Sequence, residues 1–489
     1  MNVRRVGVLT LICFSFLLFG ATKSWAILEY MDGKLTLNGF LRTQVGIHIA
    51  ESNPNLAYMG EDNHHLSMWR NWVQLEPNYQ VTDNLSVYSR LTFANENARM
   101  DDSIHSFEAF PKDYPGDLKM EDDNNMLEVA EIYADYENEA ETLWVRLGKQ
   151  QVSWGQSDGL RLLDVVNPLD QSWHGVNLLE PYLEAFDNLR ESIWMARVTA
   201  AIPSCIEDLH DVQLEMLAIP NFVPSTLPAP GSPYHLQPFT NLGLPVDENL
   251  PEGEEWGLRL MGVYKRLEWS LNYLYHYQDE GITDLRRVLV DGTAELDHPR
   301  VNSYGFGLSY DDNLRTKAVY RVEFLYEPDA PYESGQDPFG AMFGGPVDRR
   351  TVRYLIGIDR PTFVTWLNPT RTVSFGFQFI QFHVLEDRDD LEEDMITLNG
   401  SSVKKTTTLL SFSADTGYMQ DRVKPNFLFI YDERQSYYNQ IGCEFRFTDN
   451  WIGYAAVSYF GGEDKNAANS DPGSLYWMDE VMLRLTYQF

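Results

Sequence analysis

The chain has 489 residues, with 72 acidic against 38 basic side chains and a formal net charge of -34. So strong a negative charge disfavours nucleic acid as a partner, because the phosphate backbone would be repelled. Beyond the amino terminus, the sequence has no run of 18 or more apolar residues of the kind that a transmembrane helix needs. Two cysteines outside the amino-terminal region, Cys205 and Cys443, are too few for a disulfide framework.

The amino terminus has the pattern of a secretory signal peptide. Two arginines precede an apolar stretch over residues 6–20, and small residues lead up to a cleavage point after Ala26. The apolar stretch is shorter than the roughly 20 residues of a spanning helix. We therefore expect residues 1–26 to be removed and residues 27–489 to form a single domain.

The rest of the chain repeatedly alternates apolar and polar residues, which predicts β-strands with one face in lipid and the other in water. Residues 267–278 are the clearest case, since Leu267, Trp269 and Leu271 alternate with Glu268 and Ser270. The expected strands cover residues 34–48, 66–80, 85–94, 127–137, 143–154, 193–201, 211–219, 255–264, 267–278, 300–310, 316–327, 350–360, 371–384, 405–415, 422–432, 436–447, 450–460 and 478–489.

Short and long connections alternate between these strands. Turns such as 265–266 and 448–450 are short, whereas loops such as 95–126 and 220–254 are long. Bacterial outer-membrane barrels have short periplasmic turns and long external loops. The pattern predicts an all-β protein, a transmembrane antiparallel β-barrel of about 18 strands. A count of 16 stays open because the connection at 433–435 is too short for an external loop.

Aromatic residues make up 13% of the chain, and several lie at expected strand ends, as the interfacial belts of a barrel require. The expected belt includes Trp256, Trp269, Trp451, Trp477 and Tyr487.

The face opposite the apolar stripe is expected to line the lumen, and it carries arginines. A ladder of guanidinium groups would select anionic solutes through paired hydrogen bonds. Alternatively, these arginines pair with acidic residues on neighbouring strands and stiffen the wall. Both interpretations are left open for the expected lumen arginines, which are Arg42, Arg70, Arg90, Arg259, Arg321, Arg353, Arg446 and Arg484.

Residues 143–171 differ from the rest of the chain. They contain Arg146-x-Gly-Lys-Gln150, then Trp154-Gly-Gln-Ser, then Asp164-x-x-Asn167-Pro-x-Asp. This arrangement resembles the family of Gram-negative outer-membrane barrels catalogued as domain of unknown function 1302. The resemblance implies an outer-membrane protein, often regarded as a transport component, and no agreed substrate.

The same segment is too apolar for a loop in open water, so we expect residues 155–192 to fold inward and narrow the mouth of the barrel. Its polar residues either anchor the loop or touch the solute, and the many turn formers favour anchoring. The expected constriction residues are Arg146, Gln150, Trp154, Arg161, Asp164, Asn167 and Asp170.

The carboxyl terminus alternates apolar residues and ends on an aromatic one. Leu485, Tyr487 and Phe489 resemble the terminal signal by which outer-membrane barrels are recognised by their assembly machinery. Here the last strand is expected to pair with the first, which removes the sheet edges.

These observations predict a channel or transporter in the outer membrane of a Gram-negative bacterium, passing an anionic or hydrophobic solute. The expected partners are outer-membrane lipid, lipopolysaccharide, the barrel assembly machinery and an inner-membrane efflux pump, and neither a cofactor nor a metal is expected. The alternatives are an adhesin or assembly scaffold and, less favoured, a barrel hydrolase. The sequence contains one Gly-x-Ser-x-Gly match, Gly155-Gln-Ser157-Asp-Gly159, but it lies in a chain without the predicted strand-to-helix turn of a nucleophile elbow, and there is no His-Glu-x-x-His motif.

Overall fold

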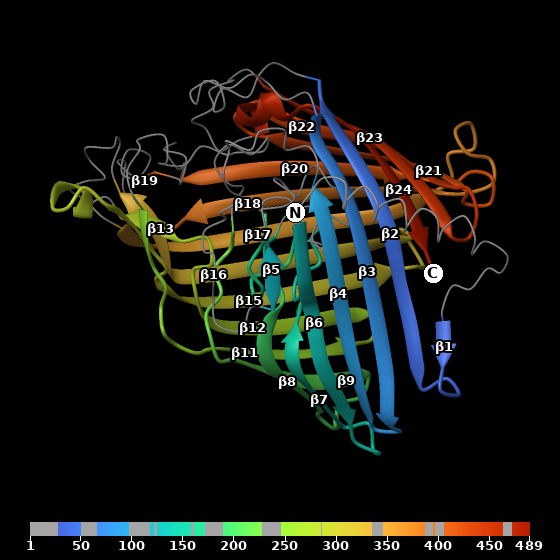
Figure 1. Ribbon diagram of the computed structural model, residues 1–489, viewed down its shortest axis with the longest axis horizontal. Coiled ribbons are helices and arrows are strands. Elements are labelled where there is room, and N and C mark those ends of the chain that lie inside the picture. Colours follow the sequence, from blue (N-terminus) through green and yellow to red (C-terminus); the bar gives the residue numbers. More distant parts are fainter. Residues whose placement is uncertain are drawn as a thin grey trace, which may run out of the picture.

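The protein is a closed antiparallel β-barrel of 18 strands (Figure 1). Closure comes from β2 (Leu35–His48), which pairs with both β3 (Leu66–Thr82) and β24 (Glu480–Gln488). Because every barrel strand has two neighbours, the barrel has no open edge. The computed structural model describes residues 28–49, 66–96, 118–121, 125–157, 161–171, 189–226, 246–284, 286–334, 346–386, 395–396, 405–462 and 472–489, and the expected signal peptide lies outside them.

Each of the 18 segments that the sequence predicted as a strand overlaps one barrel strand, so the count of 18 is confirmed. The remaining barrel strands are β4 (Leu85–Glu96), β6 (Asn125–Glu137), β7 (Leu143–Gln150), β8 (Ile193–Ala201), β9 (Leu209–Ile219), β11 (Glu255–Tyr264), β12 (Leu267–Tyr277), β15 (Arg300–Asp312), β16 (Ala318–Ser334), β17 (Pro346–Thr362), β18 (Val373–Val384), β20 (Thr406–Asp415), β21 (Val423–Asp432), β22 (Ser436–Arg446) and β23 (Trp451–Gly462).

Smaller elements lie outside the 18 barrel strands. Three short strands extend the barrel sheet, and three others form a separate sheet within the long loops. The first three are β1 (Leu28–Tyr30), β5 (Lys119–Glu121) and β19 (Met395–Ile396); the others are β10 (Val246–Asn249), β13 (Ile282–Asp284) and β14 (Ala294–Asp297). Two 3-10 helices complete the described elements, η3 (Arg286–Leu289) and η4 (Pro472–Met478). No helix in the described ranges has the length and apolarity to cross a bilayer.

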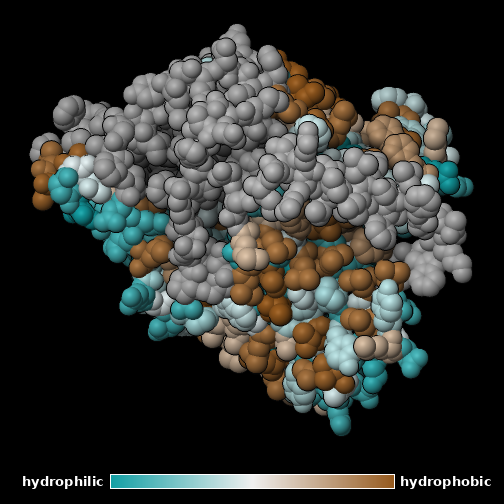
Figure 2. Space-filling model, in the orientation of Figure 1, coloured by the Kyte–Doolittle hydropathy of each residue, from teal (hydrophilic) through white to brown (hydrophobic). Residues whose placement is uncertain are grey.

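The two faces of the wall differ as the alternation predicted. On β12, Leu271 is 55% exposed, whereas Ser270 and Asn272 are buried. Figure 2 shows apolar side chains gathered over the near wall and hydrophilic ones toward the end that carries the short turns. The apolar stripe is therefore the outer face, and the polar stripe is the lumen face.

The connections divide into a short-turn end and a long-loop end. Turns of a few residues join β3 to β4, β11 to β12 and β22 to β23, whereas β7 and β8 are joined by residues 151–192 at the other end. The very short connection at 433–435 is a real turn at the long-loop end, where β21 and β22 pair up to Asp432 and Ser436. The count of 16 is therefore wrong.

Two expectations about strand ends are corrected. The strand expected over 143–154 ends at Gln150, because the chain then turns away from the wall. Trp477 does not belong to an interfacial belt: it lies in η4, is 1% exposed, and packs with Tyr438 and Phe460. Alternation along the final strand does not extend to this residue, since a 3-10 helix positions it.

Candidate functional site

The candidate site is the stretch that joins β7 to β8, together with the lumen wall that it contacts. We call its described residues, 151–157, 161–171 and 189–192, the inward segment. Leu162 and Leu163 are almost fully buried and pack against Leu325, Leu355 and Ile380, which belong to β16, β17 and β18. The segment thus leaves the wall at β7 and reaches the lumen face of strands that are not its neighbours in the barrel.

A second apolar cluster holds the beginning of the segment. Val152, Trp154 and Val166 pack against wall residues that include Met195 and Leu274. The Trp154 indole nitrogen also donates a hydrogen bond to Glu215 on β9, at 2.7 Å. Fully burying one large apolar side chain contributes about 1.5–3 kcal/mol, so these two clusters together fix the segment firmly.

Glycines in the wall make room for these side chains. A Cβ atom at Gly257 would lie 2.7 Å from the Trp154 ring, and one at Gly305 would lie 2.5 Å from a Leu163 methyl carbon. The small residues that alternate with aromatic ones along β15 therefore have a packing role. They leave the space in which the Leu163 side chain packs.

Asn167 joins the two ends of the inward segment. Its side chain is fully buried; the carbonyl oxygen accepts a hydrogen bond from the Val152 amide at 2.7 Å. Its amide nitrogen donates to the backbone oxygens of Gln150 at 3.3 Å and Glu191 at 2.8 Å. A single carboxamide therefore ties three backbone positions together.

Charged groups of the segment are paired locally. Arg161 donates to the Asp164 carbonyl at 2.6 Å and also to the Asn167 carbonyl. The Asp164 carboxylate lies 2.6 Å from the guanidinium of Arg190. Asp170 pairs with the Lys119 ammonium at 3.0 Å. These residues fold the segment on itself and onto its surroundings.

The remaining expected constriction residues also have anchoring contacts. Arg146 stays on the wall strand β7 and forms two hydrogen bonds with Asp135, at 2.7 and 2.8 Å. Gln150 is fully buried and donates to the Met195 carbonyl at 3.2 Å. All seven expected residues thus have contacts that hold the segment or the wall, which favours the anchoring interpretation.

Most of the expected lumen arginines are neutralised by neighbouring carboxylates. The guanidinium groups of Arg70, Arg321 and Arg353 lie 3.2, 2.7 and 3.0 Å from carboxylate oxygens of Glu96, Asp359 and Glu327. Arg90 lies 3.7 Å from Glu131, and Arg446 lies 2.8 Å from Glu444. Arg42 donates to Thr486 at 3.2 Å, and Arg484 stacks over Tyr454 at 5.3 Å. These contacts fit the wall-pairing interpretation better than an anion-selective ladder.

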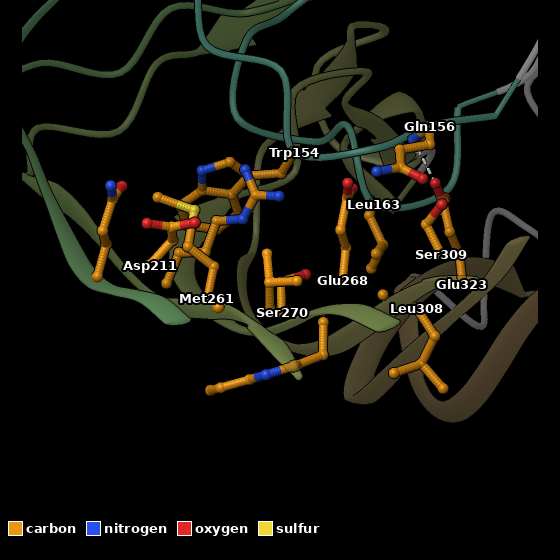
Figure 3. Close-up of a pocket in the computed structure, with 16 residues that line it drawn as sticks. Trp154, Gln156, Leu163, Asp211, Met261, Glu268, Ser270, Leu308, Ser309 and Glu323 are labelled. Atoms are coloured by element: carbon orange, nitrogen blue, oxygen red, sulfur yellow. Dashed lines mark hydrogen bonds between the residues drawn. The ribbon is translucent and has the colours of Figure 1, made fainter. Parts of the chain in front are cut away.

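Arg259 differs from the other lumen arginines. Its side chain forms no hydrogen bond or ion pair with any described residue, and its Nε atom is buried without an acceptor. It lines a cavity of about 210 Å³ between the wall and the inward segment (Figure 3). No signal in the sequence separates Arg259 from the other arginines, because its lack of a partner depends on which strands lie beside it.

The three residues of the expected assembly signal lie at the closure of the barrel. The Phe489 amide and carbonyl exchange hydrogen bonds with Gly39, at 3.0 and 3.1 Å. Tyr487 packs against Trp451 with ring centres 5.1 Å apart, and Leu485 pairs with Thr43 of β2. Recognition by an assembly machinery stays a prediction.

The barrel and its inward segment define a protein with a porin-like β-barrel fold. The chain belongs to the family described as protein of unknown function (DUF1302), whose model matches residues 64–489. No curated protein sequence matches the chain significantly.

Several solved structures share the fold. Pseudomonas aeruginosa OccK5 (OpdH) superposes with a TM-score of 0.50 at 9% identity, over 94% of this chain and 99% of the other. P. aeruginosa OccK9 (OpdG) superposes with a TM-score of 0.50 at 10% identity, over 93% of this chain and 98% of the other. Acinetobacter baumannii OccAB1 superposes with a TM-score of 0.50 at 10% identity, over 95% of this chain and 97% of the other. At such low identity the likeness extends to the fold alone.

Proposed function

We propose that this protein is an outer-membrane channel whose lumen is narrowed by the inward segment. The observation that carries the proposal is the anchoring of that segment to the inside of a closed 18-strand wall by Trp154, Leu163 and Asn167. Barrels of 16 to 18 strands are wide enough for an aqueous lumen. A loop fixed across such a lumen restricts its width without closing the barrel.

The outer face supports a membrane location. Leu147, Leu271, Ile356, Ile441 and Leu483 are between 47% and 59% exposed on five different strands. A continuous apolar surface of this kind is unfavourable in water and favourable in the hydrocarbon of a bilayer. The outer membrane of a Gram-negative bacterium is the site we propose, with its lipid and lipopolysaccharide as the surroundings.

Planar-bilayer recording tests the proposal. The purified full-length protein is expected to give discrete conductance steps, and deletion of residues 156–171 is expected to raise their size because the constriction is removed. The deleted protein must migrate as a folded barrel before heating for the comparison to count. Absence of steps from the folded wild-type protein would reject the channel, and unchanged steps after the deletion would reject the constriction.

A further inference from the structure

The cavity beside Arg259 lies between the inward segment and the wall (Figure 3). Its lining includes Val263 and Glu268, which flank the short turn from β11 to β12. One side of the cavity is formed by a row of residues that are paired from strand to strand across five neighbouring wall strands. The other side of the cavity is formed by the inward segment. The row is Gln213, Met261, Ser270, Gly307 and Glu323, and the segment contributes Trp154, Gln156 and Leu163.

Arg259 contributes to this cavity a guanidinium that has no hydrogen-bond acceptor among the described residues, although the charges of Glu215 and Glu323 lie near it. The carboxylate opposite it in register, Glu215, is already occupied: one oxygen accepts from the Trp154 indole at 2.7 Å and the other from Arg197 at 2.6 Å. A buried guanidinium nitrogen without an acceptor is unfavourable, because it has lost its hydrogen bonds to water without replacement. A ligand oxygen at this position would remove that cost.

The same cavity contains carboxylate oxygens that accept no hydrogen bond from the described residues. Glu323 is 2% exposed, and its carboxylate faces the backbone amides of Gln156 and Leu163, but its Oε2 atom has no hydrogen bond to any described residue. Glu268 is exposed on the same lining and forms no hydrogen bond or ion pair with the described residues. The cavity therefore offers acceptors for a cation in addition to its guanidinium.

The guanidinium and the carboxylates of the cavity together restrict the class of solute that can bind there. A solute with only a carboxylate would satisfy Arg259 but would meet the fields of Glu268, Glu323 and Asp211, which also line the cavity. A solute with only an ammonium would leave Arg259 without an acceptor. We propose that the cavity binds a small zwitterion, a solute with both a carboxylate and an ammonium group, and that it is a binding site along the solute pathway. This inference rests on the proposed channel function.

The size and the apolar part of the cavity restrict the ligand further. Its volume of about 210 Å³ is below the roughly 300–1,000 Å³ of pockets for drug-sized ligands. Trp154, Leu163 and Met261 provide an apolar side next to the charged groups. A free amino acid with an aliphatic side chain has the matching combination of charges, size and apolar surface.

Saturation-transfer NMR on the full-length protein in detergent micelles tests the site without relying on conduction. The probes are L-leucine, 4-methylpentanoate, which lacks the ammonium, and 3-methylbutylamine, which lacks the carboxylate. Leucine is expected to bind saturably, and each analogue is expected to bind about tenfold more weakly or worse, because one charge-assisted contact is lost. Equal binding by all three probes, or no binding of leucine, would overturn the proposal.

Substitutions of the cavity residues test whether leucine binds in this cavity. Arg259→Gln and Glu268→Gln are each expected to weaken leucine binding about tenfold or more, whereas Arg259→Lys keeps part of it. Arg446→Gln is the matched control, because Arg446 is a wall arginine that pairs with Glu444 away from the cavity. Leucine binding that survives Arg259→Gln at full strength would reject the site.

Conductance recorded on the same preparations separates the two proposals. Conductance steps with no leucine binding would leave the channel in place and overturn the zwitterion site. Leucine binding that depends on Arg259, without any conductance, would retain the site and reject the channel function.

Discussion

At the residue scale, the single side chain of Asn167 holds three backbone positions of the inward segment and its flanks together. One side chain satisfies the Val152 amide and the carbonyls of Gln150 and Glu191. Buried backbone groups that lose their partners cost about 1–3 kcal/mol each. The turn-forming pair Asn167-Pro168 pointed to a bend, but the three contacts could not be predicted, because they join positions far apart in the chain.

Replacement of Asn167 by Ala is therefore expected to loosen the segment while leaving the barrel intact. Limited proteolysis of the folded protein should cut within 151–192 faster than in the wild type, and the channel current should become noisier. The control is Asn450→Ala, which removes an amide at a short turn that contacts the Gln488 carbonyl. Equal protease resistance of Asn167→Ala and the wild type would contradict this role.

The pairing of lumen charges gives a second prediction at this scale. Arg353→Gln removes the cation that lies 3.0 Å from the buried Glu327 carboxylate, so the reversal potential in a salt gradient should shift toward cation selectivity. The double variant Arg353→Gln with Glu327→Gln removes both charges and should return the potential close to that of the wild type. An unpaired arginine ladder would instead give the same shift in both variants.

At the scale of elements, the inward segment and the wall are shaped to fit each other. Alternation along the sequence predicts each wall strand, and it places the glycines of β11 and β15 on a face without showing what they meet. Trp154 and Leu163 occupy the space that these glycines leave. The fit depends on the strand register, which a single strand's pattern does not contain.

Gly257→Ala tests this fit. The added Cβ would lie 2.7 Å from the Trp154 ring, so the ring must move and its hydrogen bond to Glu215 should weaken. Overpacking of this kind costs about 1–3 kcal/mol. The matched control is Gly357→Ala, whose Cβ would meet no atom closer than 3.5 Å. Thermal unfolding should occur at a lower temperature for Gly257→Ala only, and equal values for both variants would contradict the close fit.

At the scale of the whole molecule, the sequence predicted the closed barrel well because each strand repeats the same two-residue period. The 3-10 helix η4 was not predicted, since its buried Trp477 and Met478 follow no strand alternation. What could be predicted is thus the repeated part of the fold and the inward course of residues 155–192, and what could not are the contacts that hold this segment against the wall.

The central claim is that hydrocarbon contacts the apolar stripe of every strand and water contacts the other stripe. Cysteine labelling in reconstituted vesicles tests it on one strand, after Cys205 and Cys443 have been replaced by Ser. The claim predicts that a membrane-impermeant, water-soluble maleimide reacts with Glu268→Cys in the lumen and fails to react with Leu271→Cys on the outer face. Rapid reaction at position 271 in the folded, lipid-embedded protein would contradict it.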